Sequence, residues 1–257
     1  MTESTENIEI ENDEAQSEMG FFDHLGELRR RIIFVVIALG AGFFVSFYYI
    51  GELLESFLLR PAKSAGFTLQ NLNAMGQPIL FIKLALYASF VLTFPFTVYQ
   101  VWKFVEPGLY KNEKSWAKSI VFFTTLCFLL GTVFAYYVMV PSMMEFAAGF
   151  GTSQIQNIIE VNGYLSFITM LMLAAGLFFE LPVVSYILSR VGLLTPDFMR
   201  NYRRHSIVVI LVIAAIITPS PDPFNQLIVA VPIYVLYELS IFISGYALKQ
   251  YLKKRDV

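Results

Sequence analysis

Long apolar stretches separated by short polar turns dominate this sequence, and they restrict what the chain can fold into. Hydrophobic residues make up 56% of the 257 residues and charged residues only 15%, whereas soluble domains average about a quarter charged residues. Several stretches are close to the roughly 20 residues that a helix needs to cross the hydrocarbon core of a membrane. The sequence therefore predicts an all-α integral membrane protein.

Six apolar runs are candidate membrane spans. They cover residues 32–50, 79–101, 119–140, 164–188, 206–218 and 227–248. The fifth run has 13 residues, which as a helix would cover roughly 20 Å against a hydrocarbon core of about 30 Å, so this span should be short. Pro95 is expected to kink the second span and Pro141 to end the third.

The positions of the basic residues predict the orientation of the spans. If both termini are cytoplasmic, 15 of the 18 lysines and arginines fall in inner segments and 2 in outer ones, which follows the excess of positive charge found in cytoplasmic loops. We therefore expect six transmembrane helices with both termini inside. One membrane domain should cover residues 20–250, between an acidic, disordered cytoplasmic tail at 1–19 and a basic cytoplasmic tail at 251–257.

The side chains needed for most catalytic and metal-binding chemistry are scarce. The single cysteine, Cys127, lies in an apolar run, and His24 and His205 are far apart, so we expect no disulfide framework and no metal site. Motifs of metalloproteases, serine hydrolases, phosphate loops and dinucleotide sites are absent from the sequence. The basic clusters lie beside spans and need no nucleic acid to explain them. The sequence predicts neither an enzyme nor a cofactor.

The first inner turn, residues 102–118, combines carboxylates with aromatic rings. Its two carboxylates and four aromatic residues are Glu106, Glu113, Trp102, Phe104, Tyr110 and Trp116. A carboxylate beside aromatic rings at a membrane surface suits a cationic peptide, above all arginine, because guanidinium pairs with carboxylate through two hydrogen bonds and also stacks on rings. The alternative is an ordinary loop with an interfacial aromatic belt.

Another carboxylate precedes the first span. Residues 20–31 carry apolar side chains at helical spacing, which predicts a short amphipathic helix at the membrane surface. Glu27 lies three and four residues before Arg30 and Arg31 in this segment. Glu27 is therefore either a self-paired surface carboxylate of little energetic value or a group that a ligand can use.

Two carboxyl groups fall inside predicted spans and a third lies in the last outer turn. Glu180 is the sharpest anomaly, because a carboxyl deep in an apolar run costs a few kcal/mol and usually faces a protein interior or a wet cavity. It serves either a functional role or the capping of a notch that Pro182 leaves in the helix. Glu238 is expected to make a helix–helix hydrogen bond, and Asp222 to cap the helix that follows it.

Four short motifs, placed on this topology, resemble those of one known family. They are Glu27-Leu-Arg29, Phe104-x-x-Pro-Gly-Leu-Tyr-x-x-Glu113, Phe179-Glu-Leu-Pro182 and Thr218-Pro-x-Pro-Asp222. From about residue 20 to 250 the chain resembles the TatC family, the polytopic subunit of the twin-arginine protein translocase. One departure is Lys114, where the family often has arginine; it leaves the inference of signal binding intact.

The resemblance implies a receptor in the cytoplasmic (inner) membrane of a prokaryote, which binds twin-arginine signal peptides of folded cargo on its cytoplasmic face. Glu27, Arg29, Phe104 and Glu113 match family positions that act in signal recognition, and Glu180 matches a glutamate facing a concave pocket in the membrane. The family also implies short fifth and sixth spans and self-association in a translocase complex. Small single-span partners of the TatA and TatB types are implied too, with transport driven by the proton-motive force.

A proton-coupled small-solute transporter that uses Glu180 and Glu238 is the alternative function. A transporter should concentrate paired polar groups at mid-membrane on several spans. The charged aromatic turn instead lies at the surface, where a peptide arrives, and this favours the receptor.

Overall fold

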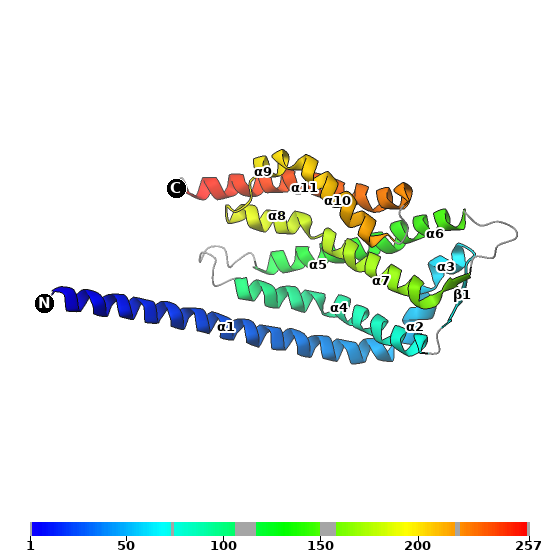
Figure 1. Ribbon diagram of the computed structural model, residues 1–257, viewed down its shortest axis with the longest axis horizontal. Coiled ribbons are helices and arrows are strands. Elements are labelled where there is room, and N and C mark those ends of the chain that lie inside the picture. The colour runs from blue at the N-terminus through cyan, green and yellow to red at the C-terminus, as the bar shows by residue number, and fades with distance from the viewer. Residues whose placement is uncertain (1, 73–74, 106–116, 150–157, 219–221, 256–257) are drawn as a thin grey trace.

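A computed structural model describes residues 2–72, 75–105, 117–149, 158–218 and 222–255. Long helices lie side by side along one direction, and both chain termini lie at the same end of the bundle (Figure 1). We call this end the terminal end. The opposite end carries short helices and the only two strands among the described residues.

The first helix, α1 (Thr2–Tyr48), is much longer than the first predicted span. It begins within the acidic segment for which the sequence analysis expects disorder, and it includes the segment expected as a separate surface helix. A helix satisfies its backbone hydrogen bonds internally, so the helical backbone can continue from the polar segment into the apolar one. The portion from Leu25 to Tyr48 is apolar and long enough to cross a membrane.

A compact cap follows α1 at the end of the bundle opposite the termini. It consists of α2 (Ile50–Leu53), the π-helical turn η1 (Leu54–Leu58), α3 (Arg60–Ser64) and strand β1 (Thr68–Gln70). Strand β1 pairs in parallel with β2 (Ile158–Glu160), from Thr68 opposite Ile158 to Gln70 opposite Glu160. The strands join this connection to a segment about 90 residues further along the chain.

The second and third spans both continue through a proline. Helix α4 (Gly76–Val105) contains Pro95 in its interior. Helix α5 (Ala117–Phe134) passes through the π-helical turn η4 (Ala135–Met139) into α6 (Val140–Ala148). The prediction that Pro141 ends the third span is therefore wrong. Pro141 occupies the first turn of α6, where a missing N–H costs little.

The fourth predicted span is broken where the sequence analysis places a notch. Helix α7 (Val161–Phe178) ends just before Glu180, and α8 (Leu181–Arg190) starts just after it. Pro182 lies in the first turn of α8 and has no N–H to offer the Phe178 carbonyl.

The last part of the chain forms a short and a long helix. Helix α9 (Pro196–Asn201) turns the chain back into α10 (Arg203–Ile217), and α11 (Pro223–Arg255) returns to the terminal end (Figure 1). With 15 residues, α10 confirms the expected short fifth helix. The sixth is not short: α11 has 33 residues, because it continues through Pro232 and through the basic segment at its end.

Five helices in the described part of the chain are long and apolar enough to cross a membrane, and α10 is shorter than the rest. The exposed sides of these helices carry large apolar side chains, as expected of surfaces that face lipid. The chain is a multi-pass membrane protein. Six spans and cytoplasmic termini remain predictions.

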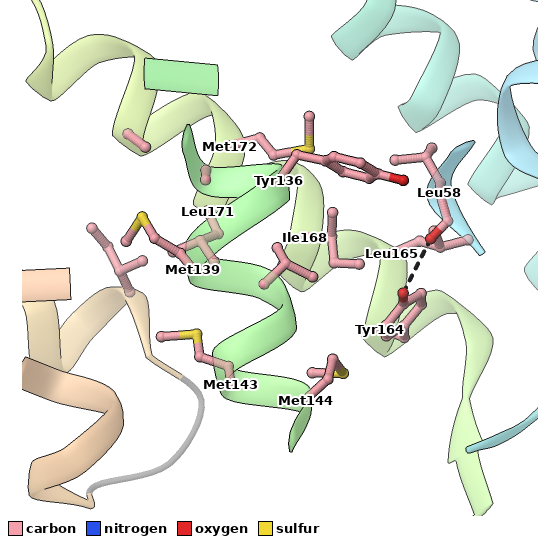
Figure 2. Packing of buried hydrophobic residues seen from close by; sticks show 14 of the residues in the cluster. Leu58, Tyr136, Met139, Met143, Met144, Tyr164, Leu165, Ile168, Leu171 and Met172 are labelled. Atoms are coloured by element: carbon pink, nitrogen blue, oxygen red, sulfur yellow. Dashed lines mark hydrogen bonds between the residues drawn. The ribbon is translucent and has the colours of Figure 1, made fainter. Parts of the chain in front are cut away.

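Helix α7 lies at the centre of the buried core. Leu165, Ile168 and Leu171 repeat along one face of α7 and are at most 1% exposed. They pack with Met139 and Met143 of the third span (Figure 2). This core joins the cap to the long helices.

Candidate functional site

The first part of the candidate site lies where α1 meets α4, near the terminal end. The two helices pack along each other, and the Ser89 hydroxyl of α4 donates a hydrogen bond of 2.7 Å to the Leu39 carbonyl of α1. Gly42 permits this approach, because a Cβ there would lie 2.8 Å from Ser89 Oγ. The contact fixes the position of α1 against α4 and therefore the place of Glu27.

Glu27 forms an ion pair with Arg31, one turn further along α1. Arg31 Nε donates to Glu27 Oε1 over 3.1 Å, and Arg31 Nη2 donates to the same oxygen. Arg31 Nη1 also donates to Gln100 Oε1 of α4 over 3.3 Å. The self-pairing that the sequence left open is therefore present, and it is joined to a second helix.

The ion pair is partly shielded from solvent. The exposed fractions of the side chains are 28% for Glu27 and 14% for Arg31, and Gln100 is buried. Arg29, the other candidate in this segment, is exposed. The structure thus brings Glu27 to the last turns of α4 and leaves Arg29 on the surface of α1.

The end of α4 supplies the aromatic part of the site. Phe104 is half-buried, one turn after Gln100, and Trp102 is buried. Lys103 lies over the ring of Tyr99, with its Nζ 5.4 Å from the ring centre. Glu106 and Glu113 lie outside the described residues, as do Tyr110 and Trp116. The described half of the site therefore combines one carboxylate, basic groups and aromatic rings.

Glu180 lies apart from these residues, at the break between α7 and α8. Its side chain is 9% exposed, and no described residue donates a hydrogen bond to its Oε1 atom. It lies close enough to Cys127 and to the backbone of Phe128 on α5 to interact electrostatically with both. Although Glu180 precedes α8 directly, its side chain makes no capping hydrogen bond. Glu180 therefore does not cap the start of α8.

A cavity of about 570 Å³ lies beside α8, and its lining includes Pro182, two residues after Glu180. Its lining comes from α5, α8 and α11 and includes Phe123, Cys127, Pro182, Val183, Tyr186 and Ile243. Most of these side chains are apolar, so the cavity suits hydrocarbon rather than a polar solute.

The two remaining candidates have structural roles that the sequence predicts. Glu238 accepts a hydrogen bond of 2.7 Å from Arg203 Nη2 of α10 and one of 3.0 Å from the Tyr234 hydroxyl. It thus joins α10 to α11. Asp222 caps α11, because its Oδ1 accepts a hydrogen bond of 2.9 Å from the Asn225 backbone N–H. Both expectations are confirmed.

The sequence analysis missed Gln100, which connects the two parts of the site. A polar residue near the end of a predicted span was the available signal, but its partner is 69 positions away. Across the described residues, no three histidine, cysteine, aspartate or glutamate side chains lie close enough to hold a metal ion. The arrangement is suited to binding a cationic group by a carboxylate and aromatic rings.

Comparison with known proteins gives one consistent family. Residues 23–232 match the family described as Sec-independent protein translocase protein (TatC). A TatC of Aquifex aeolicus is 34% identical over 244 residues, which are 93% of this chain and 99% of the relative. A TatC of Deinococcus radiodurans is 35% identical over 87% of this chain and 84% of the relative.

A solved structure has the same fold. It is described as the crystal structure of the twin-arginine translocase receptor TatC, and it superposes with a TM-score of 0.79 at 35% identity. The match covers 87% of this chain and 99% of the solved one.

Proposed function

Because the chain belongs to the TatC family of Sec-independent protein translocase proteins, we propose that it is the receptor subunit of a twin-arginine translocase. It binds twin-arginine signal peptides of folded proteins at the terminal end of the bundle. That end faces the cytoplasm, and six spans place both termini there. The family comprises translocase subunits, not enzymes.

The observation that carries the proposal is the contact between the two halves of the site. Arg31 touches Glu27 on α1 and Gln100 on α4, and Gln100 precedes Phe104 by one turn. Glu27 and the aromatic end of α4 can therefore meet one short peptide. Glu113, in the inner turn that follows α4 in the sequence, supplies the second carboxylate. Arg29 and Glu106 add charge at the border of the peptide-binding site.

Two carboxylates for two guanidinium groups explain why arginine is required. Guanidinium offers a planar fork that pairs with carboxylate through two hydrogen bonds, whereas lysine offers a compact point charge. Each charge-assisted hydrogen bond contributes about 1.5–3 kcal/mol. Arginine also stacks on rings such as Phe104.

The apolar cavity beside Glu180 serves a different step. It lies among helices that face lipid and takes the apolar surface of a small single-span partner of the TatA or TatB type. Glu180 is buried, and none of the described residues donates a hydrogen bond to its Oε1. It is then available to that partner, or to a proton when transport runs on the proton-motive force. Copies of the chain associate with these partners in the inner membrane.

The alternative function, a proton-coupled solute transporter, has less support. It needs Glu180 and Glu238 as a pair of mid-membrane carboxyl groups. Glu238 is held by Arg203 and Tyr234 between α10 and α11, and the cavity beside Glu180 is apolar.

Export by cells whose only TatC is this chain tests the proposal. The cargo is a folded fluorescent protein that carries a twin-arginine signal, and the variants are Glu27→Gln and Glu113→Gln. Glu52→Gln, on the cap at the other end of the bundle, removes the same charge and is the control. We expect both site variants to stop export and the control to sustain it. Export that survives in both site variants contradicts the proposal.

A further inference from the structure

We propose that Arg31 acts as an internal substitute for a signal arginine: it occupies Glu27 while no peptide is bound and moves onto Gln100 when one arrives. The inference rests on the proposed function and adds a self-occupied state to the receptor. Arg31 and Gln100 then have opposite effects on the binding of the peptide.

The pair between Arg31 and Glu27 already has the chemistry expected of the ligand. Two nitrogens of the guanidinium, Nε and Nη2, donate to the same carboxylate oxygen. A signal arginine must therefore compete with Arg31 for a carboxylate, and the two guanidinium groups repel each other while they do so. The pair is also better shielded than an exposed surface ion pair, so the competition is not negligible.

Gln100 provides the second place for Arg31. Its side-chain oxygen lies 3.3 Å from Arg31 Nη1, which is long for a hydrogen bond. A small shift of the guanidinium away from Glu27 can shorten this contact. Because Gln100 is neutral and buried, it satisfies a displaced Arg31 without attracting a second cation.

The exchange explains how a receptor for arginine avoids other cations. A ligand displaces Arg31 readily only if it replaces the two hydrogen bonds at Glu27 Oε1 with equally good ones. A lysine brings the charge but not the fork, so it cannot fully compensate for the pair that it breaks. Arg31 therefore raises the selectivity for arginine at some cost in affinity.

Peptide binding to the purified full-length protein in detergent tests this directly. The variant Arg31→Gln removes the competitor, and Arg30→Gln removes the same charge from the exposed neighbouring position on the same helix. We expect Arg31→Gln to bind a twin-arginine signal peptide about threefold to tenfold more tightly than Arg30→Gln does. We also expect its preference over a twin-lysine peptide to shrink. Arg31→Lys, which keeps the charge and loses the fork, should shift both quantities in the same direction by less.

Gln100→Leu is the complementary variant. It has a similar size and no acceptor, so a displaced Arg31 loses its second partner, and we expect twin-arginine binding to weaken. A chromatographic profile like that of the wild type establishes that each variant is folded.

Three results overturn the exchange. The first is weaker binding by Arg31→Gln than by Arg30→Gln, which would make Arg31 a positioning residue. The second is equal binding by those two variants, and the third is unchanged binding by Gln100→Leu. If the wild type still prefers the arginine peptide, each of these results leaves the proposed function standing. A wild type without that preference overturns the proposed function and the exchange together.

Discussion

Tyr164 shows how much a single hydroxyl group contributes to this fold. It is 3% exposed, accepts a hydrogen bond of 3.0 Å from the Ala62 N–H, and donates one of 3.1 Å to the Leu58 carbonyl (Figure 2). Both partners belong to the broken helical segment of the cap, where backbone groups lack their regular helical partners. The hydroxyl therefore ties the cap to α7.

We expect Tyr164→Phe to destabilise the protein by about 1–3 kcal/mol, because it leaves a buried N–H and a buried carbonyl without their partner. Thermal unfolding in detergent measures the loss. Tyr137→Phe is the matched control, since Tyr137 is 66% exposed. Equal unfolding temperatures for the two variants would show that the hydroxyl has no such role.

At the scale of elements, the contact between α5 and α7 depends on a close approach. A Cβ at Gly131 would lie 2.6 Å from the Ala175 carbonyl oxygen and 2.9 Å from the Gly176 Cα. Both are backbone atoms, so the strain cannot be relieved by moving a side chain.

Gly131→Ala should therefore push α5 and α7 apart and cost about 1–3 kcal/mol of stability. Gly40→Ala on α1 is the control, because a Cβ there meets nothing within 4 Å and alanine favours a helix. The readout is the unfolding temperature of each variant. A Gly131→Ala protein as stable as the control would mean that the two helices are not in close contact.

The start of α7 should make stability depend on pH. Glu160 accepts hydrogen bonds from the Asn162 side chain and from the Gly163 N–H. These bonds, led by that from Asn162, lower the pKa of the Glu160 carboxyl. A carboxyl with a lowered pKa stabilises the fold above its unfolded pKa of about 4.3, and this contribution is lost as the pH falls through the folded pKa.

We expect Glu160→Gln to unfold at a lower temperature than the wild type near neutral pH, and the difference to shrink as the solution is acidified below about pH 4. Unfolding temperatures measured for both proteins across this range test the sign. A difference that is constant or grows on acidification would refute the assignment.

At the scale of the whole molecule, the two ends of the bundle should face opposite sides of the membrane. Helix α3 lies at one end and the connection between α8 and α9 at the other (Figure 1). Ser64 in α3 and Leu193 in that connection are both exposed. Their labelling therefore reports the orientation of the whole bundle.

With Cys127 replaced by serine, Ser64→Cys should react with a membrane-impermeant thiol reagent applied to the outside of intact cells. Leu193→Cys should react only after the membrane is opened. Labelling of Leu193→Cys alone from outside would show that the orientation is the reverse of the one proposed. Labelling of both variants from outside would contradict the six spans.

Much of this architecture follows from local patterns in the sequence. Apolar runs predict the long helices, Pro182 predicts the break beside Glu180, and Asp222 predicts the cap of α11, because each depends on neighbours a few positions away. For Glu238 only part of the contact follows from the sequence. A carboxylate inside a predicted span predicts a helix–helix hydrogen bond, but the sequence does not identify Arg203 as the partner.

Features that depend on distant partners could not be predicted in the same way. The contact of Arg31 with Gln100 and the pairing of β1 with β2 join segments far apart in the chain. The third span continues through a π-helical turn just before Pro141, and no residue type in that turn predicts it. Two carboxylates of the candidate site, Glu106 and Glu113, lie outside the described residues, so their place in it remains a prediction.

Binding of a fluorescent twin-arginine signal peptide to the purified protein tests the central claim most directly. The comparisons are with a peptide in which only the two arginines are replaced by lysines, and with the Glu113→Gln variant of the protein. The receptor account predicts at least about tenfold tighter binding of the arginine peptide, because losing one charge-assisted hydrogen bond costs about 1.5–3 kcal/mol. It also predicts that the variant loses this preference. Equal binding in all these combinations would contradict it, and the inner turn would then be only a membrane-surface loop.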